Sequence, residues 1–345
     1  MGEHQQDHRR AVRAWCLYDW ANSAFATTVM AALYPPFFRT LAVAAGLPES
    51  RATAYWAYTT SIALAIISLA APVLGAVADS AGARRRFLAA FAGLGVAATA
   101  AFVANGDDTW RLAAVLFILG TIGYAGANVF YESLLPGLGH GDELDRISSR
   151  GYALGYLGGG ILLVVNAAWI LQPTLFGMPD TGFAVRASFV SVALWWALFS
   201  IPVLRHVPEP GRASQRIHPL RDGVSRLAAT FRDIRRYRQL LVFLCAFWIY
   251  HDGISTIIKM ATAYGDEIGI GLGDMVGALV LTQFVGIPST LLFGRLAGRI
   301  GSKRAITLGL AVYAVICIGG YFMHTAWQFY ICLLYTSPSP TRLQV

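Results

Sequence analysis

Residues 75–86 read GAVADSAGARRR and residues 294–305 read GRLAGRIGSKRA, so one short motif occurs twice in the chain. Both copies have a glycine at the start, a second glycine seven positions on, and a basic pair just after it. The shared residues are Gly75, Gly82, Arg84 and Arg85 in the first copy and Gly294, Gly301, Lys303 and Arg304 in the second. Each copy lies between two long apolar stretches. A repeated turn of this kind indicates an internally duplicated membrane protein.

The composition excludes a soluble globular protein. Of the 345 residues, 56% are hydrophobic and 13% are charged, and the mean hydropathy is +0.54. The apolar residues form runs of about 18 to 25, the length at which a helix crosses the hydrocarbon core. A transmembrane β-barrel would instead alternate apolar and polar residues, and that pattern is absent. We therefore expect an all-α integral membrane protein.

The apolar runs predict about ten spans. They lie at 14–38, 54–78, 86–104, 110–136, 151–172, 185–204, 239–263, 275–297 and 304–323, with a last span that begins near Trp327.

The net charge is +8, and the basic residues are concentrated in alternate segments between the spans. Nine of the 27 lysines and arginines lie between Arg205 and Arg238, and 21 of the 27 lie in five segments that alternate along the chain. The loops between these segments carry the acids Asp107, Asp108, Asp180, Asp266, Glu267 and Asp274. The positive-inside rule then places the amino terminus and both repeated turns in the cytoplasm. We expect a multi-pass protein of the bacterial inner membrane, without a cleaved signal peptide and without a nucleic-acid partner.

The spans and the basic stretch divide the chain into segments. We expect a six-helix bundle over 1–204, a basic cytoplasmic linker over 205–238, a shortened bundle of about four helices over 239–335, and a non-native tail over 336–345. Apolar residues at helical spacing from Pro219 to Leu240 predict an amphipathic helix. This helix would bind anionic headgroups or lie in solvent as a linker. The tail, TSPSPTRLQV, is polar and Pro-rich, so we expect a truncated sequence that lacks two spans, the alternative being a ten-span variant.

Polar residues within the first span are candidates for a transport path. Asp19, Asn22 and Ser23 are three to four positions apart and share one helix face. That face should line a cavity or pack on a neighbouring helix, and Asp19 is also close enough to the boundary for an interfacial role.

The fourth and seventh spans carry further candidates. Asn128 and Glu132 lie one turn apart, with Tyr124 a turn earlier; the glutamate would carry a proton or bond a neighbouring helix. In the seventh span His251 and Asp252 precede Gly253, which would permit a local break in the helix. Asp252 and Lys259 share a face and would form a structural pair, contact substrate or relay protons.

The fifth span begins with closely spaced glycines, Gly151, Gly155, Gly158, Gly159 and Gly160. Small residues at this spacing let helix backbones approach closely. No strand precedes them, so they are not a nucleotide-binding loop. Ser-His-Asp, HExxH and Walker patterns are also absent, and Cys16, Cys245, Cys317 and Cys332 lack metal-ligand spacing and should be small buried hydrophobes. We expect neither an enzyme nor a bound cofactor or metal.

The first copy of the turn resembles the loop between spans two and three of the major facilitator superfamily, G-x-x-x-D-x-x-G-[RK]-[RK]. Gly75, Asp79 and Gly82 fit it, and the basic pair Arg84 and Arg85 follows one position later than in that pattern, whereas the second copy has Gly298 in place of the Asp. The resemblance implies two six-helix bundles, about ten helices being present here. It also implies that the first turn is a conformational latch, with Asp79 near a helix end of the other half.

Four segments resemble a narrower family, the vacuolar amino-acid effluxers linked to autophagy in fungi and their bacterial relatives. They are YDWANSAFATTV from Tyr18, VFYESLLP from Val129, RGYALGYLGGG from Arg150 and YHDGISTII from Tyr250. Family members often have Asn where this chain has Glu132 and His251. The resemblance implies a secondary transporter, with efflux of neutral amino acids as one possible activity. We expect a small-molecule substrate, protons as co- or counter-transported ions, and a monomer. The alternative is a non-transporting membrane sensor or scaffold of the same fold.

Overall fold

The computed structural model describes residues 2–81, 83–106, 109–140, 142–209 and 238–336. Within these ranges some side chains lie outside the description, among them those of Asp79, His251, Asp252, Lys259 and Lys303. The predicted amphipathic helix falls almost wholly on residues 210–237 and is therefore not described.

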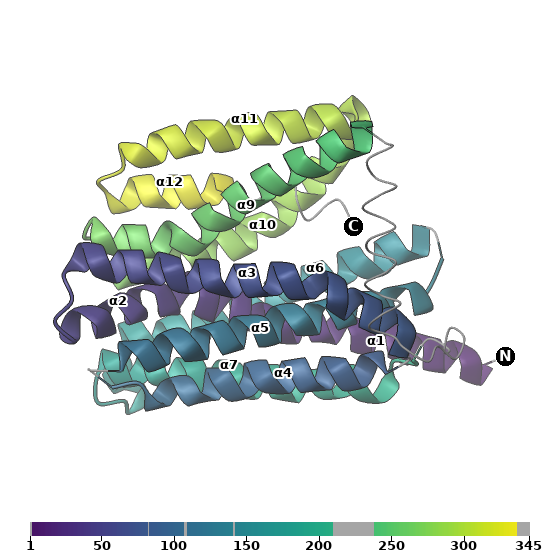
Figure 1. Ribbon diagram of the computed structural model, residues 1–345, viewed down its shortest axis with the longest axis horizontal. Coiled ribbons are helices and arrows are strands. Elements are labelled where there is room, and N and C mark those ends of the chain that lie inside the picture. The colour runs from purple at the N-terminus through teal and green to yellow at the C-terminus, as the bar shows by residue number, and fades with distance from the viewer. Residues whose placement is uncertain (1, 82, 107–108, 141, 210–237, 337–345) are drawn as a thin grey trace.

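Long helices that run alongside one another make up the described chain, which contains no strand (Figure 1). The predicted all-α fold is confirmed. After the first span come α3 (Glu49–Ala81), α4 (Arg84–Ala101), α5 (Trp110–Leu134), α6 (Asp142–Leu171), α7 (Thr181–His206), α9 (Arg238–Glu267), α10 (Leu272–Ile300), α11 (Ser302–Tyr321) and α12 (Ala326–Thr336). Short 3-10 turns follow α4, α5 and α6 as η2 (Phe102–Ala104), η3 (Leu135–Gly137) and η4 (Pro173–Phe176).

Five helices in the described ranges are long and apolar enough to cross a membrane. These segments are Glu49–Ala71, Arg84–Ala104, Trp110–Gly137, Arg146–Leu171 and Thr181–His206. Shorter apolar stretches occur at Leu241–Tyr250, Leu272–Gly286 and Thr307–Tyr321. All eight overlap predicted spans.

The first span is one helical rod with a change of winding in its middle. It consists of α1 (Gly2–Ala24), a π-helical stretch η1 (Phe25–Leu33) and α2 (Tyr34–Ala44). The backbone N–H of Tyr34 donates to the carbonyl of Val29, five residues earlier. Pro35 and Pro36 follow and have no N–H, so the carbonyls before them cannot make ordinary helical bonds. The whole rod, from Gly2 to Ala44, extends further at both ends than the predicted span at 14–38.

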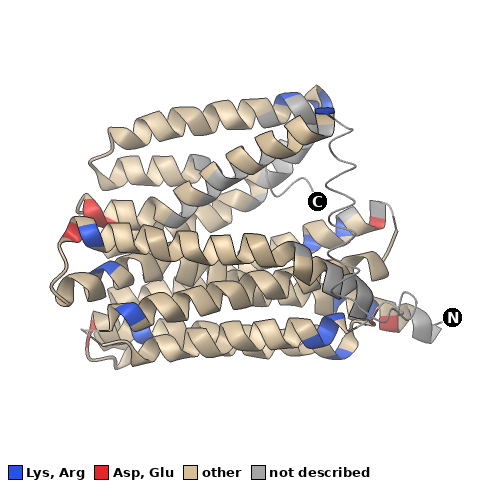
Figure 2. Cartoon of the chain, viewed as in Figure 1, with Lys and Arg blue, Asp and Glu red and all other residues tan. Residues whose placement is uncertain are grey.

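The helices form two groups, which we call the N half (α1 to α7) and the C half (α9 to α12). In Figure 1 the C half lies along one side of the N half, and contacts between them run through α2, α3, α6, η1, α9 and α10. Successive helices alternate in direction. The start of α1 and the ends of α3, α5 and α7 lie at one end, which we call the basic end. The turns from α2 to α3 and from α9 to α10 lie at the far end, where acidic residues gather in Figure 2.

Aromatic side chains fill the core of the N half around Tyr34. Its ring lies 4.3 Å from that of Phe102 and 5.1 Å from that of Phe117, and its hydroxyl donates to the carbonyl of Ala113 at 2.8 Å. A buried tyrosine hydroxyl needs such a partner, because an unpaired polar group in an apolar core is costly. The ring of Phe189 on α7 lies 5.6 Å from that of Tyr34, so the cluster holds α2 against η2, α5 and α7 near the far end.

Candidate functional site

Two asparagines from separate stretches of sequence meet inside the N half. Asn22 on α1 donates through Nδ2 to Oδ1 of Asn128 on α5, at 2.5 Å. The Asn22 residue is 2% exposed, and Asn128 is half-buried. An amide pair in apolar surroundings is stabilised because each partner satisfies a group that lipid could not. The structure thus brings together two of the predicted path residues.

Asp19 and Ser23 point from α1 toward the glycine stripe of α6. A Cβ atom at Gly155 would lie 2.6 Å from Ser23 Oγ and 3.1 Å from Asp19 Oδ2. At Gly158 it would lie 2.6 Å from the carbonyl oxygen of Trp20. The predicted close approach of backbones at these glycines is confirmed. Of the two surroundings predicted for the polar face, packing on neighbouring helices is the one that these contacts show.

Aromatic side chains border the amide pair on its basic-end side, and the sequence analysis did not single them out. Trp15 stacks on Tyr131 with ring centroids 4.4 Å apart, and its Nε1 donates to the Tyr131 carbonyl at 3.1 Å. Tyr18 is fully buried and its ring lies 4.7 Å from that of Tyr131. Their spacing on α1 and α5 matches that of the polar residues, which is the signal that could have found them.

The residues of the predicted stripe, Tyr124, Asn128 and Glu132, lie in different surroundings. Tyr124 packs on Phe25 with ring centroids 5.4 Å apart, and Asn128 bonds α1, as described above. Glu132 lies near the end of α5 with an exposed side chain. The stripe therefore joins the core to the basic end.

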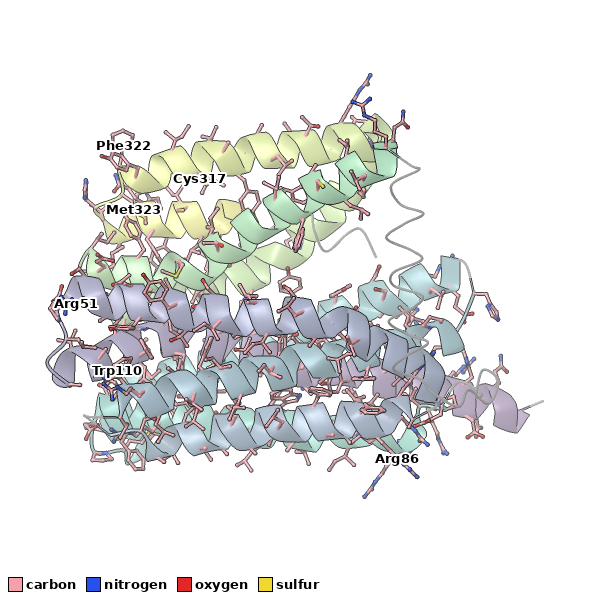
Figure 3. All side chains as sticks on the ribbon, viewed as in Figure 1. Arg51, Arg86, Trp110, Cys317, Phe322 and Met323 are labelled. Carbon is pink, nitrogen blue, oxygen red and sulfur yellow. The ribbon has the colours of Figure 1, made fainter. Side chains whose placement is uncertain are left out.

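The first copy of the repeated turn is partly described. Arg84 donates through Nη1 to the carbonyl of Ser133 at the end of α5, at 2.7 Å. Arg85 forms an ion pair with Glu209, Nε to Oε1 at 3.5 Å, and its Nη1 donates to the Leu204 carbonyl of α7 at 3.3 Å. The neighbouring Arg86 points away from the bundle (Figure 3). The basic pair thus contacts helix ends of its own half, while Gly82 and the Asp79 side chain lie outside the description.

The second copy keeps the tight turn. Gly301 is the one residue between α10 and α11, and its φ of 85° lies in the left-handed region that favours glycine. Gly294 lies on α10, Lys303 and Arg304 lie on the first turn of α11, and Arg304 is exposed.

The helix break that Gly253 would permit does not occur in α9. His251, Asp252, Gly253 and Lys259 all lie on α9, which is an unbroken helix from Arg238 to Glu267. Within a span each backbone group needs an internal partner, so one glycine lowers helix stability without breaking the helix.

The expectation of four buried thiols is also only partly right. Cys16 is buried and Cys332 half-buried, but Cys245 and Cys317 are exposed, Cys317 on α11 as Figure 3 shows. A cysteine on the outer face of a membrane helix contacts lipid, so an apolar sequence context does not by itself place it in the core.

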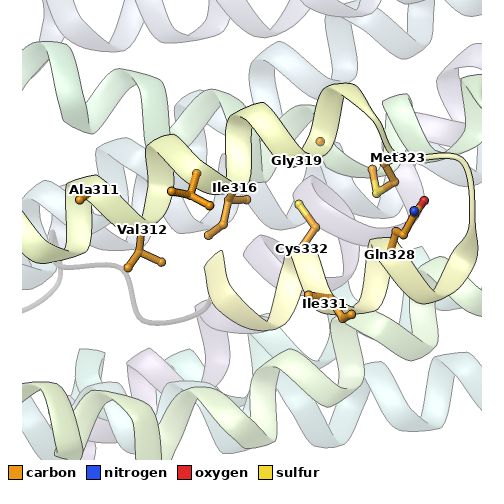
Figure 4. A pocket seen from close by; sticks show the side chains of 10 residues that line it. Ala311, Val312, Ile316, Gly319, Met323, Gln328, Ile331 and Cys332 are labelled. Atoms are coloured by element: carbon orange, nitrogen blue, oxygen red, sulfur yellow. The ribbon is translucent and has the colours of Figure 1, made fainter.

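A cavity of about 520 Å³ lies between α11 and α12 (Figure 4). Its lining is apolar, with Val312, Ile316, Met323 and Cys332 on its walls and Gln328 at one end. None of the predicted path residues whose side chains the structure describes lines it. It has few groups that could orient a polar solute, and we do not assign it to the transport path.

Contacts between the two halves involve residues outside the predicted transport path, among them two acids of the predicted outer loops. Arg39 on α2 pairs with Asp266 near the end of α9, Nη1 to Oδ2 at 2.6 Å. Thr262 on α9 donates through its hydroxyl to the Ala31 carbonyl of the π-helical stretch at 2.7 Å. Thr53 on α3 donates to Oε2 of Glu267 at 3.3 Å. These contacts lie toward the far end.

Comparison with known proteins assigns the chain to a family. The family described as "Vacuole effluxer Atg22 like" matches residues 7–337. The chain belongs to this family. Among its relatives, the uncharacterized MFS-type transporter YxiO of Bacillus subtilis (strain 168) is 35% identical over 332 residues, which cover 96% of this chain and 78% of YxiO. Autophagy-related protein 22 of Yarrowia lipolytica is 25% identical over 221 residues, 54% of this chain and 36% of the fungal protein.

Solved structures of similar shape are transporters, and one of them, XylE, is described as a member of the major facilitator superfamily. The xylose transporter XylE of E. coli matches with a TM-score of 0.55 and 15% identity, over 96% of this chain and 84% of XylE. The nucleoside transporter NupG matches with a TM-score of 0.55 and 13% identity, over 99% of this chain and 80% of NupG. At these identities the likeness shows the fold. The chain of this Atg22-like family is therefore a multi-pass membrane protein with the major facilitator fold, and its relatives are transporters.

Proposed function

We propose that this Atg22-like protein is a secondary active transporter that exports small solutes, neutral amino acids among them, by alternating access. A proton gradient drives it. The description of its family as effluxers supports the direction of transport, and its membership of a transporter family supports the mechanism. The absence of enzyme motifs is in keeping with a protein that moves its substrate unchanged.

The proposed path uses Asp19, Asn22, Asn128, Glu132, His251, Asp252 and Lys259. The observation that carries the proposal is the Asn22–Asn128 amide pair, 2.5 Å long and next to Asp19 in a bundle whose buried residues are mainly apolar. Uncompensated polar groups inside a membrane cost free energy, so such a cluster favours a functional role. A carboxyl that alternates between buried and hydrated surroundings can bind and release a proton, and we assign that role to Asp19.

The proposed latch is the first repeated turn, with Asp79, Arg84 and Arg85 as its polar residues and Gly75 and Gly82 as its hinge. The second turn, with Gly294, Gly301, Lys303 and Arg304, keeps the bend without the acid. The basic end faces the cytoplasm of a bacterial cell, and the arginines of residues 205–238 bind anionic lipid headgroups there. The working unit is a monomer made of two bundles, 1–204 and 239–335, joined by this linker.

Flux measured in proteoliposomes tests the proposal. We expect uptake or release of radiolabelled neutral amino acids that depends on an imposed pH gradient and falls to background in Asp19→Asn. Asp7→Asn is the matched control, because Asp7 lies on the same helix in an exposed pair with Arg10 and should leave flux unchanged. A protein that moves no solute under any gradient would instead be a sensor or scaffold.

A further inference from the structure

Arg39 is a buried charge at the junction of the two halves. The residue is 4% exposed, and its guanidinium contacts groups from both sides of the junction. From the C half, Asp266 Oδ2 lies 2.6 Å from Nη1 and the Ala263 carbonyl accepts from Nη1 at 3.3 Å. From the N half, Glu49 Oε2 lies 4.0 Å from Nη2. A buried guanidinium needs such partners, so separation of α2 from α9 would require water to replace them.

A second bond a short distance along α9 has its origin in the sequence Tyr34-Pro35-Pro36. In a helix the carbonyl of Ala31 accepts from residue 35, or from residue 36 in the π-helical pattern, and both are prolines without an N–H. The N–H of Tyr34 is taken by Val29. The Ala31 carbonyl is thus available, and the Thr262 hydroxyl of α9 donates to it at 2.7 Å in a fully buried position.

Both contacts can be exchanged for water at small net cost. Desolvation of an ion pair offsets much of its Coulomb attraction, so a pair at a junction that opens is gained or lost with a small change in free energy. Burial raises the pKa of the Asp266 carboxyl, and the Arg39 guanidinium opposes that rise. The Ala31 carbonyl likewise accepts from Thr262 when the halves touch and from water when they part.

We propose that Arg39, Asp266 and the Thr262–Ala31 bond together form a reversible lock that holds the far ends of the two halves closed. Because the prolines have no N–H, the Ala31 carbonyl is available as one acceptor of this lock, and Arg39 supplies the cation that pairs with Asp266. Thr53 and Glu267, bonded at 3.3 Å nearby, extend the same contact toward α3. The inference rests on the proposed alternating-access function, because a lock is useful only where the far end opens.

Distances between spin labels test the lock without any transport measurement. The labels are placed at Ala44→Cys, on the end of α2, and Gly271→Cys, in the turn between α9 and α10, after replacement of the four native cysteines. Both sites are exposed. In nanodiscs we expect Asp266→Asn and Arg39→Gln each to raise the ratio of long to short label distances about tenfold, and Thr262→Val to shift it in the same direction. Arg51→Gln, an exposed arginine at the same end, is the control and should have no effect.

The charge-exchange variant Arg39→Asp/Asp266→Arg separates a lock from a general loss of packing, since it should restore the short distance. Unchanged distances in both single variants, or long distances in the exchanged variant, would overturn the inference. If the single variants do not fold, the exchanged variant alone decides, a short distance supporting the lock and a long one refuting it. A protein that moves no solute yet shows these shifts would refute the proposed transport and leave the lock standing.

Discussion

At the scale of single residues, the Asn22–Asn128 contact shows how a polar pair is tolerated in an apolar bundle. Each carboxamide has donor and acceptor groups, and the bond uses one from each. A hydrogen bond of this kind contributes modestly to stability, because an unfolded chain in a membrane also finds polar partners.

Removal of either amide should weaken the protein by a measurable and non-additive amount. We expect Asn22→Ala and Asn128→Ala each to lower thermal stability in detergent, and the double variant to lose less than the sum of the two. The coupling energy should be about 1 kcal/mol, near the upper part of the range for such bonds in membranes. Strict additivity would mean that the two amides do not interact.

Sequence alone could nominate Asn22 and Asn128, because polar residues within apolar runs stand out, but it could not pair them. Their pairing depends on which faces of α1 and α5 meet, which packing decides. Arg39 was missed for a different reason: it lies one residue past the predicted end of the first span at 38. An arginine on the side of the acidic loops departs from the positive-inside pattern, and that departure was the available signal.

At the scale of elements, the contact between α1 and α6 depends on glycines that leave no room for side chains. The stripe was predictable, since small residues at regular spacing indicate close helix packing. The π-helical stretch Phe25–Leu33 was not predicted, although the two prolines after it remove the donors that an α-helix would need there. The unbroken α9 shows that a glycine permits a break in a helix but does not cause one.

Substitution of Gly158 by alanine should separate α1 from α6. The added Cβ would lie 2.6 Å from the Trp20 carbonyl, a backbone atom that cannot move independently of the helix. Overpacking of this kind costs about 1–3 kcal/mol, so we expect a clearly lower melting temperature. Gly93→Ala on α4 is the control, since nothing lies within 4 Å of its Cβ position, and it should be neutral or slightly stabilising. Equal melting temperatures would contradict close packing at Gly158.

At the scale of the whole molecule, charge and fold agree about the two ends of the bundle. Basic segments that are far apart in sequence come together at the end where α1 begins, whereas the turn from α9 to α10 brings acids to the far end (Figure 2). Alternation of helix direction produces this separation, so the positions of lysine and arginine predict which helix ends lie together. The contact between the two halves could not be predicted in this way, because it depends on side chains from distant helices.

The orientation of the bundle follows from this separation and can be measured in cells. In a cysteine-free background, Gln172→Cys places a thiol in the turn between α6 and α7 at the far end, and His206→Cys places one at the end of α7 at the basic end; both positions are exposed. Because basic segments are retained in the cytoplasm, a membrane-impermeant maleimide should label Gln172→Cys in intact bacteria and His206→Cys only after permeabilisation. Labelling of both thiols in permeabilised cells controls for reactivity. The reverse pattern in intact cells would place the amino terminus outside and invert the lock as well, so that it would close the cytoplasmic end.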